Sequence, residues 1–73
     1  MDTVLASLVT QLLAWVAAGP RTHADAMEVW RTSCPRLPAW EEALDQGLIV
    51  CPGAGAVPVS LTPAGRDWLA RNG

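Results

Sequence analysis

The 73-residue sequence predicts a single domain over residues 1–73 of the α+β class, mainly α. In it a two-stranded β-hairpin lies between a three-helix core and a C-terminal helix. Three observations predict this order. Apolar residues recur at helical spacing over residues 3–18, Gly47 separates a helical pattern from a short apolar run, and Thr62-Pro63 separates a second apolar run from another helical pattern. Glycine commonly ends a helix, and a hydroxyl residue followed by proline commonly begins one.

The composition is that of a small folded domain with an acidic balance. Hydrophobic residues make up 51% of the chain, which excludes a disordered tail. Four tryptophans must supply the large core side chains, because there is no Phe or Tyr. Five Arg, no Lys and seven acids give a net charge of −2. A free-standing nucleic-acid-binding domain usually has a basic stripe and a high pI, so any basic patch here has to be local.

The first helix is predicted over residues 3–18, and Gly19-Pro20 ends it with Gly19 as a left-handed cap. Because this helix carries no charge, its apolar surface is wider than a three-helix core of this size requires. Two interpretations stay open, namely ordinary burial or packing of one stripe against a second copy. The stripe that we assign to self-association is Leu5, Val9, Leu13 and Val16.

The same segment is not expected to be a signal peptide or a membrane span. A signal peptide needs a positive first region, whereas this chain opens with Met1-Asp2. As a helix the segment reaches ~24 Å, less than the ~30 Å hydrocarbon core of a bilayer. Cys34 and Cys51 allow one disulfide, but small secreted domains of this size usually carry several, so two reduced thiols are expected. We therefore expect a cytoplasmic protein without membrane contact.

The second and third helices have recognisable boundaries. Thr22 and Asp25 resemble a capping box that begins the second helix at Thr22. That helix should end before Pro35, because the residue that precedes a proline resists helical dihedral angles. Pro38 fits the first position of the third helix, and Gly47 caps its end.

The hairpin is predicted from two short apolar runs, residues 48–51 and 57–61, joined by the glycine-rich loop 52–56. Pro58 places the second strand at an edge or a bulge, because proline has no N–H to donate to a sheet. Thr62 then caps the last helix, with Pro63 at its first position and Trp68 facing inward.

Residues 43–49, a loop, and residues 59–69 follow the order leucine, glycine-leucine-isoleucine, leucine-threonine-x-x-glycine. This pattern resembles that of winged-helix regulators of the MarR and PadR types. The resemblance implies a winged helix, in which a helix-turn-helix core carries a two-stranded β-hairpin wing. It also implies that Arg36, Ala39, Glu42 and Ala43 would lie nearest the bases of bound DNA, with residues 53–56 at the wing tip.

The charges of this segment depart from that family pattern. Residues 38–46 carry Glu41, Glu42 and Asp45 and no base, whereas affinity for duplex DNA comes largely from Lys and Arg that neutralise phosphates. Two hypotheses follow. The first is a regulatory or protein-interaction module that associates with a protein partner or with itself through the first helix. The second is a DNA-binding transcriptional regulator that uses Arg21, Arg31, Arg36 and Ala39, unless those arginines pair with nearby carboxylates.

No enzymatic chemistry is expected. His23 is the only histidine, and the sequence has no Ser/His/Asp set, no complete phosphate-binding glycine loop and no metal-ligand spacing. We therefore expect no cofactor, no metal and no small-molecule substrate.

Overall fold

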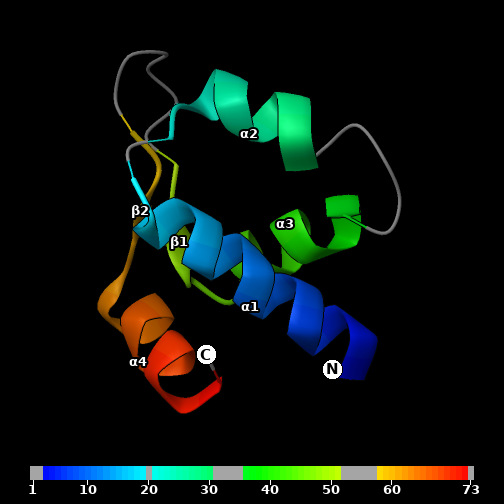
Figure 1. The fold of residues 1–73 in the computed structure, drawn as a ribbon, viewed down its shortest axis with the longest axis vertical. Helices are drawn as coiled ribbons and strands as arrows, with labels where there is room; N and C mark the ends of the chain where they lie inside the picture. Colours follow the sequence, from blue (N-terminus) through cyan, green and yellow to red (C-terminus); the bar gives the residue numbers. More distant parts are fainter. Residues whose placement is uncertain (1–2, 20, 31–35, 52–57, 73) are drawn as a thin grey trace.

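A computed structural model describes residues 3–19, 21–30, 36–51 and 58–72, apart from the side chains of residues 36 and 37. Within that part of the chain the fold is mainly helical, with four helices and a two-stranded antiparallel sheet, which confirms the predicted class (Figure 1). The elements are α1 (Thr3–Ala17), α2 (His23–Trp30), α3 (Arg36–Asp45), β1 (Ile49–Val50), β2 (Ser60–Leu61) and α4 (Pro63–Asn72).

Helix α1 is the centre of the domain, and α3, α4 and β2 all pack on it (Figure 1). Its buried residues, Val9, Leu12, Leu13 and Val16, form one core with buried side chains of α2, α3 and β1, and partly buried side chains of β2 and α4 pack against this core. The other buried members of that core are Ala26, Trp30, Ala39, Trp40, Ala43, Leu48, Ile49 and Val59. The opposite face of α1 is a narrow stripe outside the apolar pattern, and it exposes Ser7, Gln11, Ala14 and Ala18.

The start of α2 confirms the predicted capping box. The backbone N–H of Thr22 donates to Asp25 Oδ2 at 2.9 Å, and the backbone N–H of Asp25 donates to Thr22 Oγ1 at 3.1 Å. Two N–H groups that a helix start would otherwise leave without a partner are thereby satisfied. Thr22 is the cap itself, so the helix begins one residue later, at His23.

Helix α3 begins at Arg36, two residues before the position predicted from Pro38. The first four N–H groups of a helix have no partner within it, so a proline at the third position removes no hydrogen bond. The other end is as predicted. Gly47 has φ 68°, Gly47 N–H donates to Leu44 O at 3.1 Å, and Leu48 N–H donates to Ala43 O at 2.9 Å. These two bonds form a Schellman motif around a left-handed glycine.

Gly19 does not share that conformation, although the sequence predicted it. Among the described glycines only Gly47 has a positive φ. Helix α1 ends instead in a turn in which Ala18 N–H donates to Ala14 O at 3.0 Å. In the last turn of α1, the carbonyl of Trp15 accepts a hydrogen bond from Arg21 Nε–H at 3.2 Å.

The sheet is shorter than predicted and has a contact that the sequence did not indicate. Strands β1 and β2 pair in the register Ile49↔Leu61 and Val50↔Ser60. Next to β2, Val59 forms an antiparallel bridge with Arg21, and Val59 N–H donates to Arg21 O at 2.6 Å. Pro58 precedes this bridge and lies outside the ladder, where its missing N–H has no effect. The predicted loop 52–56 lies outside the described residues.

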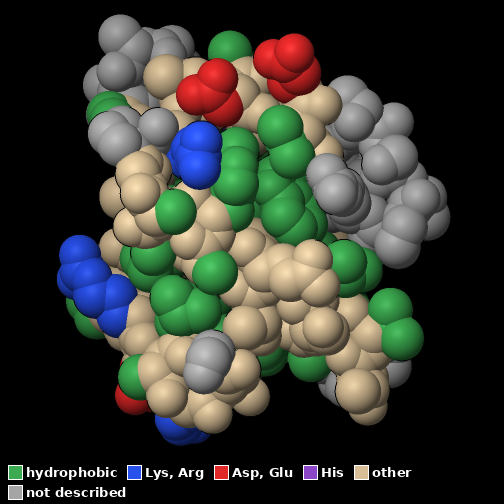
Figure 2. Space-filling view, viewed as in Figure 1, with side chains coloured by type: hydrophobic (Ala, Val, Ile, Leu, Met, Phe, Trp, Pro, Cys, Tyr) green, Lys and Arg blue, Asp and Glu red, His purple; other side chains and the backbone are tan. Residues whose placement is uncertain are grey.

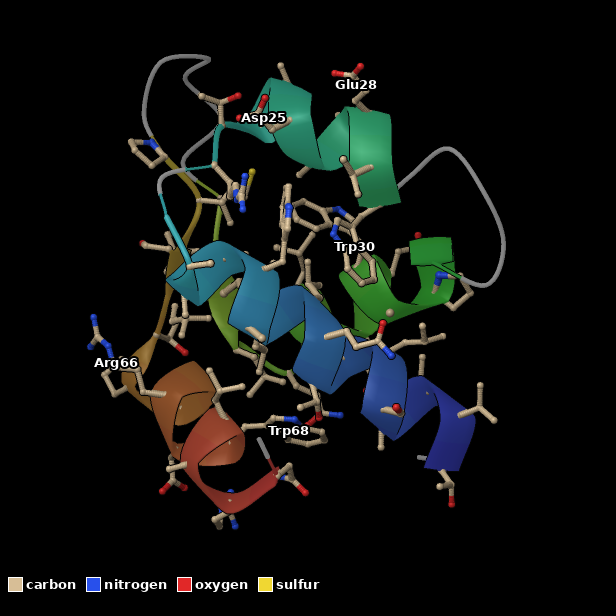
Figure 3. All side chains as sticks on the ribbon, in the orientation of Figure 1. Asp25, Glu28, Trp30, Arg66 and Trp68 are labelled. Carbon is tan, nitrogen blue, oxygen red and sulfur yellow. The ribbon has the colours of Figure 1, made fainter. Side chains whose placement is uncertain are left out.

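Hydrogen bonds of Thr62 connect the start of α4 to the end of α3. Its hydroxyl accepts a hydrogen bond from Gly65 N–H at 3.0 Å and donates one to Gly47 O at 2.5 Å, while its own N–H donates to Leu48 O at 3.1 Å. The predicted cap is thus confirmed, and it also joins two helix ends. Farther along α4, Trp68 Nε1–H donates to Thr10 Oγ1 at 3.1 Å, which holds Trp68 against α1 as predicted (Figure 3).

Replacing Thr62 with valine should lower the free energy of unfolding by about 2 kcal/mol. Valine keeps the shape of the side chain but can neither cap Gly65 nor donate to Gly47 O. Urea unfolding followed by circular dichroism measures the loss. Thr62→Ser is the control, because it keeps both bonds and should lose less than about 1 kcal/mol. Equal stability of Thr62→Val and the unchanged chain would contradict the role assigned to this hydroxyl.

Candidate interaction surface

The outer face of α3 is acidic. Trp40 and the small residues Ala39 and Ala43 turn into the core and are at most 3% exposed. Because a helix repeats every 3.6 residues, this burial directs the polar residues of α3 outward. The exposed residues of α3 and its C-terminal turn are Pro38, Glu41, Leu44, Asp45, Gln46 and Gly47, with Leu44 40% exposed.

A shallow hollow of about 410 Å³ lies between this face and the first turns of α1. Its lining is Leu5, Pro38, Glu41, Glu42 and Asp45. The four residues from α3 occur at spacings of three, four and seven, which is one face of a helix. Glu42 Oε2 accepts a hydrogen bond from Gln46 Nε2 at 2.5 Å, but no cation from the described residues forms an ion pair with Glu41, Glu42 or Asp45. The hollow therefore carries three carboxylates that the described part of the domain does not neutralise.

Two of the positions assigned to base contacts lie in the core because of this rotation of α3. Ala39 and Ala43 are fully buried, so their methyl groups fill the core and do not reach a surface where a base could lie. Glu42 is half-buried in the hollow. Arg31 and the side chain of Arg36 lie outside the described residues.

Arg21 is engaged inside the domain. Its backbone forms the bridge to Val59, its Nε–H donates to Trp15 O at 3.2 Å, and its guanidinium carbon lies 4.6 Å from the centroid of the Trp15 ring. A cation over a tryptophan face is stabilised by the ring quadrupole. Arg21 therefore joins the end of α1 to the sheet, and its guanidinium is only partly available to an outside anion.

The arginines whose side chains the structure describes stand apart from one another on the face drawn in Figure 2. Arg66 projects away from α4, and Asp25 and Glu28 point outward from α2 (Figure 3). Arg71 forms an exposed ion pair with Asp67 at 3.1 Å. The three arginines with described side chains thus lie in three different places and do not form one basic patch.

The stripe assigned to self-association lies mostly in the core. Val9 and Leu13 are fully buried and Val16 is 6% exposed, while Leu5 is half-buried beside the acidic hollow. Packing within this chain, and not a second copy, covers the first three side chains. This burial has a simple cause: a domain of this size must use most of its large apolar side chains to build its own core.

Other reactive groups in the described part of the chain are isolated. No three His, Cys, Asp or Glu side chains there are grouped so that they could hold a metal ion. Cys51 is a half-buried free thiol, and His23 packs edge-on to Trp40 with ring centroids 6.5 Å apart. Cys34 lies outside the described residues. None of the described helices has the length and apolar character that crossing a bilayer requires.

A second hollow of about 400 Å³ lies between the end of α1, β2 and α4. Its walls are mainly apolar, and its charged member is Arg66.

The sequence alone could have predicted part of the acidic hollow, because Pro38, Glu41, Glu42 and Asp45 share one helical face. The contribution of Leu5 could not be predicted in this way, since it depends on how α1 crosses α3.

Comparison with known proteins adds no relative. No family model, no curated protein and no solved structure matches this chain.

Proposed function

We propose that this chain is a winged-helix module that acts by binding another protein. The order of its elements supports the winged-helix assignment. A helix, a bridging residue, two helices, two antiparallel strands and a final helix follow one another, and Arg21 extends the sheet beside the returning strand. The resemblance of residues 43–69 to regulators of the MarR and PadR types supports the same assignment and suggests a regulatory role.

The acidic outer face of α3 carries the proposal. In winged helices that bind DNA, this helix enters the major groove. Here the face presents Glu41 and Asp45 to solvent, with Glu42 beside them, and no base from residue 38 to residue 46. Carboxylates directed at phosphates repel them, and Lys and Arg supply most of the affinity for duplex DNA. A protein surface is the partner that such a face suits.

Titration with short DNA duplexes at low salt tests this proposal. We expect no saturable change in fluorescence anisotropy and no localised shifts of the α3 amide signals in NMR spectra. A Glu41→Arg/Asp45→Arg variant is the positive control for the scaffold and should bind duplex DNA at least roughly tenfold more tightly at low salt, because it replaces repulsion with phosphate contacts.

Saturable, salt-sensitive binding of duplex DNA by the unchanged chain would contradict the proposal. In that case the DNA-binding regulator, acting through residues around Arg36, would replace it. Shifts on α3 in that experiment would identify the helix, and shifts elsewhere would identify another DNA-binding surface.

A further inference from the structure

We infer that the acidic hollow between α1 and α3 binds a cationic, amphipathic helical segment of a partner protein. This inference rests on the proposed function, because it names the partner class and the surface that a protein-binding winged helix would use.

The two sides of the hollow differ in chemistry. The α1 side is uncharged, since no residue from 3 to 18 carries a charge, and it contributes Leu5. The α3 side contributes Pro38 and three carboxylates. From Pro38 to Asp45 the lining extends about 10 Å along α3, at 1.5 Å per residue, which matches two turns of a partner helix. A helix with apolar residues on one face and Lys or Arg beside them complements both sides.

The carboxylates are placed where they disfavour the helix that holds them. Glu41 and Asp45 are a like-charge pair at i and i+4, which destabilises a helix by roughly 0.2–0.5 kcal/mol. Glu42 and Asp45 also lie in the last turns of α3, at the negative end of the helix dipole, and the last turn contains no basic residue. Local rules that a sequence breaks together are most often broken at functional sites. A cation from a partner would relieve both repulsions.

The described cations of this chain cannot provide that relief. Arg21 lies over Trp15, Arg71 pairs with Asp67, and Arg66 lines the other hollow. Among the described residues the acidic hollow therefore has no paired cation, and charge complementarity favours a basic partner segment over an acidic or neutral one.

A designed peptide pair tests the inference. One peptide is a short amphipathic helix with Leu on one face and Arg and Lys flanking it, and the other is a scrambled peptide of identical composition without an apolar face. Titration of the folded chain, followed by amide shifts in NMR spectra, should show saturable binding of the amphipathic peptide. The shifts should lie on residues 38–46 and around Leu5, with weaker binding of the scrambled peptide.

Two double variants with equal changes in net charge separate the hollow from general attraction. Glu41→Gln/Asp45→Asn should weaken binding of the amphipathic peptide roughly tenfold, since two charge pairs between the chain and the peptide are lost near the surface. Glu28→Gln/Asp67→Asn, on exposed sites of α2 and α4, should leave the affinity within about twofold. The first variant should also unfold at slightly higher urea concentration than the unchanged chain, because its like-charge pair is gone.

Several results would overturn the inference: equal binding of the two peptides, shifts around Val59 and Arg66 instead of α3, or equal effects of the two double variants. Its failure differs from failure of the proposed function. Binding of duplex DNA on α3 would contradict both the proposed function and this inference. If neither the peptide nor DNA binds, only the inference of a basic partner segment is contradicted.

Discussion

Replacement of Gly65 by alanine is expected to abolish the folded state of this domain. A Cβ atom at residue 65 would overlap the carbonyl oxygen of Leu48 and lie 3.0 Å from its carbonyl carbon. Both are backbone atoms, and Leu48 is held by its bond to Ala43 O and by the bond it accepts from Thr62. Relief of the overlap would require α4 to move away from the end of α3, so Gly65 marks a close helix approach and not a special backbone conformation.

The cost should be comparable to the whole stability of the domain. Chains of this length have a free energy of unfolding of about 4–10 kcal/mol, and a backbone overlap that breaks caps at two helix ends belongs among the mutations that cost more than ~4 kcal/mol. Circular dichroism and amide NMR spectra of Gly65→Ala should show a largely unfolded chain at 25 °C. The matched control is Gly19→Ala, since no described residue beyond its chain neighbours has an atom within 4 Å of a Cβ there and its φ is not positive. A native-like spectrum for Gly65→Ala would disprove the close approach.

Leu13→Ala is expected to lower the free energy of unfolding by about 3 kcal/mol without changing the oligomeric state. Leu13 is fully buried in the core of its own chain, so truncation removes packing contacts and leaves a cavity. Gln11→Ala, on the exposed face of the same helix, should change stability by less than about 0.5 kcal/mol. Urea unfolding measures both variants.

The same variant decides between the two interpretations of the first helix. If Leu13 packs only within its chain, sedimentation of the folded fraction should be the same before and after the substitution at every concentration. If a second copy covered it, Leu13→Ala would shift a dimer toward monomer and the unfolding midpoint would depend on protein concentration. Small loss of stability combined with loss of a dimer would restore the self-association surface predicted from Leu5, Val9, Leu13 and Val16.

Local signals in the sequence predicted the ends of the helices well. Thr22 with Asp25, Gly47, and Thr62 with Pro63 each act through hydrogen bonds or dihedral angles that span only a few residues, so neighbouring residues suffice to predict them. Pro38 and Gly19 were less informative for the same reason. A proline is tolerated anywhere in a first helical turn, and a glycine adopts a left-handed conformation only where the next turn requires it.

What the sequence alone determined is the class of the fold, the order of its elements and the acidity of α3, because periodicity, caps and charge are properties of short stretches. The tertiary structure decided which way each helix is rotated. The rotation of α3 buries Ala39 and exposes Glu41, and the rotation of α1 places Leu13 in the core. Arg21 pairs with Val59 beside the sheet, and its guanidinium lies over Trp15. An apolar surface wider than one core needs allows several rotations, and close packing between elements distant in sequence selects one of them.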